Sequence, residues 1–310
     1  MEIFVSGSLA YDRIMDFNGR FSDHILPDKI HMLNVCFTVN GLKEKFGGTA
    51  GNIAYALSML GEKPALLASI GRDYEPYFTW LKKNGVNTNN IRIIDEELTA
   101  GAYITTDLSD NQITGFNPGA MKHPCGIPMT SVNPSDAIAV IAAGNLAEME
   151  GYCNTCRENS IPYIFDPGQS LTGWKKDALM NCINGAYILI SNDYELEIIQ
   201  TLLGLRQDQI LNLVSNIITT KAEHGSILFS RAGKVSVPAI PPEKVVDPTG
   251  AGDAYRGGLI KGLALKKSMA LSALMGSLCA SYAVACYGTQ EYHIEPDEFM
   301  KRFEKLTING

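Results

Sequence analysis

The segment that decides the fold reads Asp247-Pro248-Thr249-Gly250-Ala251-Gly252-Asp253-Ala254-Tyr255-Arg256-Gly257-Gly258. An extended stretch ending in two valines precedes it, and a helical pattern begins near Ala251. Gly250 and Gly252 leave the turn without Cβ atoms, so a ligand can approach the backbone closely. The first N–H groups of a helix have no partner within the helix and lie at the positive end of its dipole. The segment is therefore typical of an anion-binding site.

Asp253 falls in the first turn of this helix, beside the predicted anion site. A carboxylate at that place suits a general base that takes a proton from a hydroxyl while a phosphoryl group arrives. The alternative is a helix cap, in which the aspartate accepts hydrogen bonds from backbone N–H groups. The four residues 250–253 alone favour the cap, whereas the full segment favours the catalytic interpretation.

Apolar runs rich in Val, Ile and Leu alternate with helical patterns along the rest of the chain. The run 137–143 is apolar throughout, as expected of a strand in a parallel sheet that helices cover on both faces. This alternation predicts an α/β fold. The expected strands are 2–9, 64–70, 137–144, 162–166, 186–191 and 226–231, and the expected helices include 50–60, 74–84, 193–203, 208–220, 253–265 and 268–286.

Two segments break the alternation, namely residues 13–45 and 99–116. Val35, Phe37 and Val39 alternate with less apolar residues, which predicts a half-buried strand. We expect the two segments to form a small antiparallel sheet beside the main one. Such an appendage often acts as a lid over a site, and a plain extension of the sheet edge is the alternative.

Two further clusters occupy predicted turns between a strand and a helix. Gly47 and Gly48 precede a helix whose first turn contains Asn52, and Asn192 and Glu195 begin another helix with the spacing of a capping box. Because the carboxyl ends of parallel strands meet at one edge of a sheet, we expect these clusters and residues 247–258 to share a ligand site.

Composition and missing motifs exclude several classes of function. The 310 residues carry a net charge of −7 and no basic patch, which argues against nucleic-acid binding. No apolar run reaches the roughly 20 residues that span a bilayer. Seven scattered cysteines indicate free thiols in a reducing compartment such as the cytoplasm, and the Cys153–Cys156 pair fits a structural role better than a redox or metal site. The fingerprints of P-loop and dinucleotide-binding proteins are absent.

Together these motifs resemble the PfkB carbohydrate kinases, the ribokinase family, over nearly the whole chain. Residues 46–60 and 247–258 resemble its two signatures, residues 192–195 match its Asn-x-x-Glu motif, and residues 6–12 resemble its opening strand. The resemblance implies one ribokinase-like domain over residues 1–310, with a mostly parallel sheet, flanking helices and a β lid. It implies ATP-dependent phosphoryl transfer to an alcohol, with Mg²⁺ as the accompanying metal.

The resemblance also implies roles for individual residues. Asp253 would be the base, and the N–H groups of Gly250, Ala251 and Gly252 would hold the transferring phosphoryl group. The other roles fall into three sets: acceptor binding by Asp12, Gly47, Gly48 and Asn52; ATP binding by Asn192, Glu195, Gly225, Ser230 and Gly233, with Glu195 reaching the magnesium through water; and a monovalent cation such as K⁺ at Asp247 and Thr249.

Three short strings resemble the bacterial adenosine-kinase-like branch, namely residues 116–121, 166–169 and 253–258. Phe116 would stack on a purine and Gln169 would bind a base edge, although a core position in the lid is the alternative for Phe116. The resemblance favours the 5′-hydroxyl of adenosine as the acceptor, with ribokinase or fructokinase activity as the alternative, and it allows a homodimer through the lid. A ligand sensor and an NAD-dependent dehydrogenase fit less well, because Asp253 and its glycines are intact and the dinucleotide fingerprint is missing.

Overall fold

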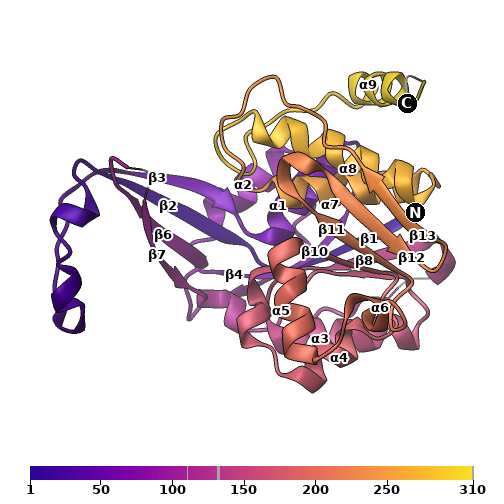
Figure 1. Ribbon diagram of the computed structural model, residues 1–310, viewed down its shortest axis with the longest axis horizontal. Coiled ribbons are helices and arrows are strands. Elements are labelled where there is room, and N and C mark those ends of the chain that lie inside the picture. The colour runs from indigo at the N-terminus through magenta and orange to yellow at the C-terminus, as the bar shows by residue number, and fades with distance from the viewer. Residues whose placement is uncertain (110, 131–132, 309–310) are drawn as a thin grey trace.

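Apolar strands form the centre of the molecule. In the computed structural model, which describes residues 1–109, 111–130 and 133–308, nine strands make one sheet in the order β13-β12-β11-β10-β9-β8-β1-β4-β5 (Figure 1). Neighbours from β5 to β11 are parallel, and β12 and β13 are added antiparallel. The strands are β1 (Glu2–Ser6), β4 (Ala65–Gly71), β5 (Ile91–Ile94), β8 (Ala137–Ile141), β9 (Tyr163–Phe165), β10 (Ile188–Asn192), β11 (Asn216–Thr220), β12 (Ser226–Ser230) and β13 (Gly233–Val237).

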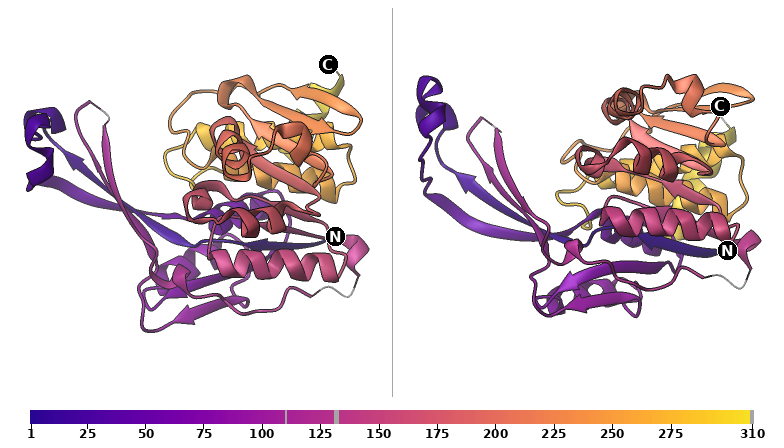
Figure 2. Two further views of the ribbon diagram at one scale, coloured as in Figure 1. Left: turned by 60° about the horizontal axis from the view of Figure 1, so that its bottom comes forward. Right: turned by 90° about the horizontal axis from the view of Figure 1, so that it is seen from below.

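Helices cover both faces of this sheet because the side chains of each strand point alternately to opposite sides. In β1, Ile3 and Val5 belong to one apolar core and Phe4 to the other. Figures 1 and 2 show the two layers of helices. The first layer contains α1 (Thr49–Met59), α2 (Glu75–Lys83), α7 (Ala251–Ala264) and α8 (Met269–Val284), and the second contains α3 (Leu146–Glu158), α4 (Lys176–Ile183) and α5 (Asp193–Leu203).

The remaining helices are short or peripheral. They are α6 (Gln207–Ile210), α9 (Pro296–Ile308) and the 3₁₀ turns η1 (Phe21–Asp23), η2 (Pro27–Met32), η3 (Gly119–Lys122), η4 (Pro134–Asp136), η5 (Gly168–Gly173) and η6 (Ala222–His224). Within the described ranges, none of the helices combines the length and the apolar character that crossing a bilayer requires.

A second sheet projects away from the central one (Figures 1 and 2). In the described part of the chain it has the order β3-β2-β6-β7, from β2 (Ala10–Phe17), β3 (Val39–Gly47), β6 (Ala100–Thr106) and β7 (Gln112–Asn117). The segments were predicted correctly, but the purely antiparallel arrangement was wrong, because β2 and β6 pair in parallel. The strand predicted around Val35 and Phe37 was also wrong, since Phe37 packs on Phe17 and Phe21 ahead of β3. Asp110, which falls within the predicted segment 99–116, lies outside the described residues.

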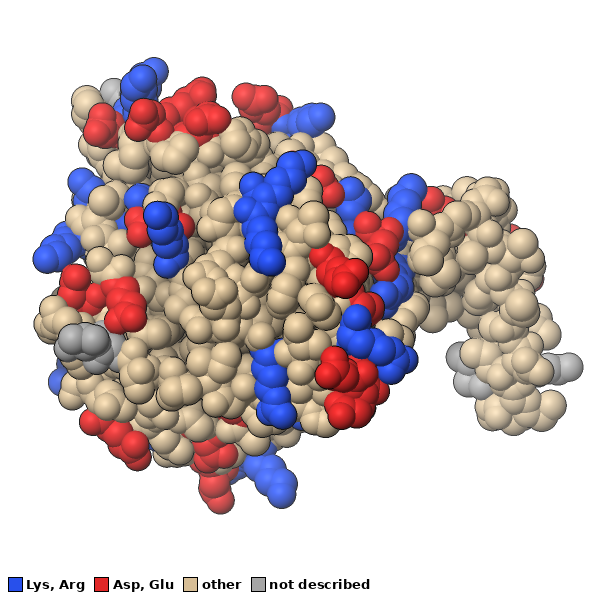
Figure 3. Space-filling model, turned by 180° about the vertical axis from the view of Figure 1, so that it is seen from behind, with Lys and Arg blue, Asp and Glu red and all other residues tan. Residues whose placement is uncertain are grey.

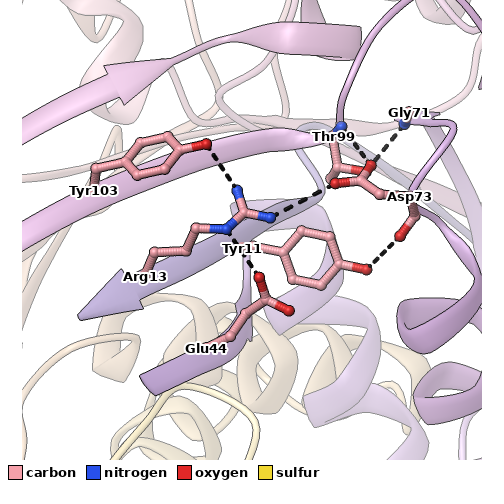
Figure 4. Close-up of polar contacts among 7 residues, drawn as sticks. All are labelled: Tyr11, Arg13, Glu44, Gly71, Asp73, Thr99 and Tyr103. Carbon is pink, nitrogen blue, oxygen red and sulfur yellow. Dashed lines mark hydrogen bonds and ion pairs between the residues drawn. The ribbon is translucent and has the colours of Figure 1, made fainter. Parts of the chain in front are cut away.

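The carboxylate of Asp73 anchors the base of this second sheet. Asp73 follows β4 of the central sheet, and its Oδ1 accepts hydrogen bonds from the Thr99 amide at 2.7 Å and the Thr99 hydroxyl at 2.6 Å. Its backbone carbonyl accepts a hydrogen bond from the Tyr11 hydroxyl at 2.8 Å. Because Tyr11 belongs to β2 and Thr99 immediately precedes β6, one residue fixes two strands of the second sheet to the core (Figure 4).

Arg13 extends this anchor across the sheet. Its Nη2 lies 3.6 Å from the Asp73 carboxylate, its Nε donates to Glu44 on β3 at 2.9 Å, and its Nη1 donates to the Tyr103 hydroxyl on β6 at 3.2 Å (Figure 4). Residues 13, 44 and 103 occupy one cross-strand row, which explains how a single side chain reaches both neighbouring strands.

The helix predicted over residues 208–220 was wrong. The chain leaves the helical conformation after α6, and residues 216–220 form β11 in the interior of the central sheet. Ile217 and Ile218 are fully buried, one in each apolar core. A strand covered on both faces has apolar side chains in succession, so its pattern resembles that of a buried helix.

The two cysteines of the Cys153–Cys156 pair are buried in α3, and all seven cysteines, each in a described range, are free thiols. Burial raises the pKa of Cys156 to about 12. A thiolate is therefore unfavourable there, which argues against redox or metal chemistry at this pair.

Glycines allow α7 to pack closely between α1 and α8. A Cβ atom at Gly257 would lie 2.5 Å from the Cβ of Ala56 in α1, and one at Gly258 would lie 2.7 Å from the Cβ of Cys279 in α8. Real atoms do not approach so closely, so larger residues at these positions would force the helices apart. The close packing fixes the start of α7, where Asp253 lies.

We expect Gly258→Ala to lower the free energy of unfolding by about 1–3 kcal/mol, because the added methyl group overpacks the α7–α8 contact. Gly151→Ala is the matched control. Gly151 is also inside a helix but has open space where its Cβ would lie, so alanine there should stabilise by about 0.5–1 kcal/mol. Urea unfolding midpoints measure both effects. Equal effects of the two substitutions would contradict the packing argument.

Candidate active site

The first turns of α1 and α7 meet although they are far apart in the sequence. Nδ2 of Asn52 donates a hydrogen bond to Oδ2 of Asp253 at 2.8 Å, across a separation of 201 residues. The predicted base and one predicted acceptor-binding residue therefore belong to the same site.

The turn before α7 has the conformation expected of an anion site. Gly250 is the N-cap residue and has φ +77°, a left-handed conformation that favours glycine. A Cβ atom there would also lie 2.9 Å from the side chain of Thr289. The helix has no side-chain cap, and the Asp253 carboxylate bonds Asn52 instead. The Asp253 carboxylate therefore does not cap α7, which argues against the capping interpretation, and the Ala251 N–H donates to the Pro248 carbonyl at 3.2 Å.

The ionisation of Asp253 is set by opposing effects. Burial raises the pKa of Asp253 to about 6, while the positive charge of Arg256 and the hydrogen bond from Asn52 act to lower it. The charges of Asp166 and Glu195 add to the increase. Near neutral pH the group is mostly a carboxylate, and its pKa is close enough to 7 for it to accept a proton efficiently.

A buried network fixes the orientation of the Asn52 amide. Its Oδ1 accepts hydrogen bonds from the Thr289 hydroxyl at 2.9 Å and from Nε2 of Gln290 at 3.0 Å. With the oxygen so occupied, the NH₂ group must face Asp253. Sequence analysis missed Thr289 and Gln290, because they lie in a loop before α9 with no motif around them.

The carboxylate of Asp12 lies over Gly47. A Cβ atom at Gly47 would be 2.5 Å from Oδ2 of Asp12, so only glycine leaves this space to the carboxylate. Gly48, with φ +88°, would place a Cβ atom 2.7 Å from the amide nitrogen of Ala10. Burial, together with the charge of Asp247, raises the pKa of Asp12 to about 6. The structure thus brings together Asp12, Gly47, Gly48 and Asp247.

Asp12 and Phe116 occupy one row of the second sheet. In the strand register, Asp12 pairs with Ala102 and Ala102 pairs with Phe116, so all three side chains are on the same face. The spacing of strands places Asp12 and Phe116 roughly 10 Å apart. Phe116 is 53% exposed, which argues against a place in the core of the lid. Gln169 is also exposed, at the start of η5 beyond the carboxyl end of β9.

Asn192 and Glu195 form a capping box at the start of α5. Oδ1 of Asn192 accepts from the Glu195 amide at 2.7 Å, and Oε2 of Glu195 accepts from the Asn192 amide at 2.8 Å. Burial raises the pKa of Glu195, and the charge of Asp166 adds to this effect. Within the described ranges, no group of three or more His, Cys, Asp or Glu side chains is arranged to hold a metal ion directly.

The residues predicted to lie near ATP do not all meet. Gly225 precedes β12 at the carboxyl edge of the sheet, where Ser226 is paired with Thr220 at the end of β11. Ser230 and Gly233 form the hairpin at the opposite end of β12, and Ser230 is paired with Asn216 at the start of β11. Five strand residues span roughly 15 Å. The prediction that groups Ser230 and Gly233 with the site is therefore wrong, because β12 runs antiparallel and carries them to the far edge.

Asp247 joins the turn before α7 to the loop after α8. Its Oδ1 accepts from the Thr249 amide at 2.9 Å, and its Oδ2 accepts from the Gly288 amide at 3.1 Å. The carboxylate organises two loops at the place predicted for a monovalent cation.

Comparison with known proteins agrees with this geometry. The model of the pfkB family carbohydrate kinases matches residues 11–296. The nucleoside kinase of Methanocaldococcus jannaschii is 32% identical over 277 residues, covering 89% of this chain and 91% of that one. A ribokinase from Haemophilus influenzae is 23% identical over 259 residues, covering 79% and 83% of the two chains.

Solved structures show the same fold. The nucleoside kinase of Burkholderia thailandensis in complex with inosine superposes with a TM-score of 0.87 and 34% identity, covering 98% of this chain and 97% of that one. With the family model matched over most of the chain and the predicted fold confirmed, the chain belongs to the pfkB family of carbohydrate kinases, which are ATP-dependent phosphotransferases.

Proposed function

We propose that this kinase transfers the γ-phosphoryl group of ATP to the 5′-hydroxyl of a nucleoside, with adenosine as the preferred acceptor. The observation that carries the proposal is the row of the second sheet in which Asp12 and the exposed Phe116 share one face. The nucleoside kinases among the relatives support it, and one of them has been solved with inosine and with ADP and inosine together. Sugar kinase activity remains the alternative, since ribokinases are also among the relatives.

Asp12 and Phe116 suit the two halves of a nucleoside. The Asp12 carboxylate can accept hydrogen bonds from both hydroxyls of the ribose diol, and Phe116 offers an exposed ring on which the base can stack. The small side chain of Ala102 between them leaves room for a flat ligand. Gln169 would bind an edge of the base, and Gly47 and Gly48 would let the ribose approach the backbone.

Asp253 would act as the base for the acceptor hydroxyl. The acceptor is a neutral alcohol, and its proton must leave during the transfer. Asn52 holds the carboxylate in place, and the N–H groups of Gly250, Ala251 and Gly252 would bind the oxygens of the transferring phosphoryl group, whose negative charge they favour.

The acidic groups of the site suit a metal that arrives with the nucleotide. Mg²⁺ keeps several waters and is commonly held by substrate phosphates with one or two carboxylates, so a cluster of three protein ligands is not required. Asn192, Glu195 and Gly225 would lie near the phosphates, with Glu195 reaching the metal through water. Bound Mg²⁺ would neutralise charge on the triphosphate. Asp247 and Thr249 would hold a monovalent cation such as K⁺.

The second sheet would act as a lid and as a dimer contact. Figure 3 shows mostly uncharged atoms on the projecting end of the molecule, and the segment between β2 and β3 exposes Leu26, Met32, Leu33 and Val35. Covering such side chains with a second copy would bury apolar surface. Sedimentation equilibrium should therefore show a homodimer, and a monomer at all concentrations would contradict this part of the proposal.

Asp253→Asn should lower kcat by roughly 10²–10⁴-fold, because asparagine keeps the shape of the side chain and loses its basicity. Folding and ATP binding should survive, which circular dichroism and calorimetry can check. If Asp253 has only a structural role, asparagine should serve nearly as well. A folded Asp253→Asn variant with wild-type kcat would contradict the proposed mechanism.

Acceptor specificity is measured as kcat/KM with adenosine, inosine, other nucleosides, ribose and fructose. We expect adenosine to give the highest value. Phe116→Ala should raise the KM for nucleosides by roughly 5- to 150-fold, the range that corresponds to 1–3 kcal/mol of stacking. Ile113→Ala is the matched control, since Ile113 is an exposed apolar residue of β7 on the opposite face of the sheet. A higher kcat/KM for ribose or fructose than for every nucleoside would contradict the proposal.

Lid closure should appear as increased protection from hydrogen exchange in β3, β6 and β7 when adenosine is added. Closure excludes water and so limits wasteful hydrolysis of ATP. Strands β8 and β9 of the central sheet serve as the internal reference, because they are buried in every state. Unchanged protection of the second sheet at saturating nucleoside would contradict its role as a lid.

A further inference from the structure

Arg256 is a buried cation next to the start of α7. Its side chain is 8% exposed, and that of its partner Asp166, just beyond β9, is 2% exposed. Nη2 of Arg256 donates to Oδ1 of Asp166 at 2.8 Å, and Nε is in ion-pair contact with the other carboxylate oxygen. A buried charge is costly unless it is paired, and this ion pair, with one hydrogen bond from Nη2, provides the pairing.

The third nitrogen of the guanidinium faces the anion-binding turn. A Cβ atom at Gly252 would lie 2.9 Å from Nη1 of Arg256. Gly252 therefore leaves space for the guanidinium as well as for a ligand. Arg256 therefore packs against the glycine turn at the start of α7, about one helical turn after Asp253.

Three carboxylates surround this single cation. Arg256 interacts electrostatically with Asp166, Asp253 and Glu195, which come from the end of β9, from α7 and from α5. Burial disfavours the charged form of Arg256, but these carboxylates outweigh it and raise its pKa further. These carboxylates therefore favour the charged form of Arg256.

We propose that Arg256, clamped by Asp166, is a positioning residue that holds a fixed positive charge behind the anion-binding turn and beside Asp253. It does not touch the acceptor. It acts by keeping Asp253 a carboxylate despite burial and despite the neighbouring negative charges. The pairing also connects two sequence strings, residues 166–169 and 253–258, so that Gln169 and Asp253 are tied to a common ion pair. This inference rests on the proposed role of Asp253 as the base.

The charged groups around Asp253 determine in which direction each substitution shifts the pKa of its carboxyl group. The charged and titratable groups that face it are Arg256 on its own helix, Asp166, Glu195, Tyr77 of α2 and Tyr292 before α9. Arg256 is the largest influence that lowers the pKa of Asp253, ahead of Asn52, and Asp166 raises it. Removing the arginine and removing Asp166 must therefore shift the ionisation of Asp253 in opposite directions.

The test is the ionisation of Asp253 in the full-length protein, read from the ¹³C shift of its carboxyl carbon and assigned by its loss in Asp253→Asn. Arg256→Gln should raise the titration midpoint by about one pH unit or more, and Asp166→Asn should lower it. In the pH profile of kcat at saturating ATP and nucleoside, the fall on the acid side should shift together with the titration midpoint of Asp253. The KM for the nucleoside should change little. Arg256→Lys keeps the charge and should restore most of the wild-type midpoint.

Two further variants keep the test decisive. Arg256→Gln leaves Asp166 buried and unpaired, so that variant alone can lose stability for a reason unrelated to Asp253. The double variant Arg256→Gln/Asp166→Asn removes both charges and should still fold. Its titration midpoint for Asp253 should be raised, because Arg256 influences the pKa of Asp253 more strongly than Asp166 does. Arg157→Gln is the control. Arg157 bonds Asn154, Asn181 and Tyr163 away from the site, so its loss should lower the Tm without moving the midpoint.

An Asp253 midpoint that is unchanged in Arg256→Gln or in the double variant overturns this inference, as does a shift of equal size in Arg157→Gln. The ¹³C titration reports ionisation whether or not Asp253 is the base. An Asp253→Asn enzyme with wild-type kcat would overturn the proposed role of Asp253 as the base and leave the ionisation result standing, so the two failures are distinguishable.

Discussion

The hydrogen bond between Asn52 and Asp253 joins the first quarter of the chain to the last, and the site depends on it. It exists because α7 packs against α1 closely enough for the first turns of the two helices to touch. Gly257 and Gly258 permit that approach by leaving room for Ala56 on one side and Cys279 on the other. Because helix packing distances depend on the side chains at the contact, two residues without side chains determine where the carboxylate lies.

The second constraint is electrostatic. Asp12, Asp253, Asp166, Glu195 and Asp247 all gather at one edge of the sheet, in a protein whose net charge is already negative. Such a cluster is unfavourable unless cations or hydrogen-bond donors compensate it. Arg256 compensates Asp166, backbone N–H groups compensate Asp247, and Asn52 donates to Asp253. Burial still raises the pKa of Asp12 and of Asp253 to about 6, which leaves both groups mostly ionised near neutral pH.

The site also bears on the functions that the sequence left open. A ligand sensor would not need a carboxylate with a raised pKa at the start of a helix, and the family match places the chain among phosphotransferases. The choice between nucleoside and sugar depends on the second sheet instead. Its attachment through Asp73 and Arg13 is firm at the base, whereas its far end stands clear of the core (Figure 2). Asp12 lies at this base, with its carboxylate over Gly47.

The sequence alone determined the α/β class, the family and the glycine turn before the helix that carries Asp253, because those features depend on local patterns and on motifs of adjacent residues. It could not determine which motifs meet. Ser230 and Gly233 are close to Gly225 in sequence, yet an antiparallel strand carries them to the opposite edge of the sheet. The pattern of residues 216–220 predicts a helix although the segment is a strand, because a strand buried on both faces lacks the alternation that identifies strands. Thr289, Gln290 and the pairing of Arg256 with Asp166 carry no local signal, since each acts through a partner many residues away. Only the tertiary structure decides such contacts, because the packing of α7 between its neighbours brings these distant segments to one place.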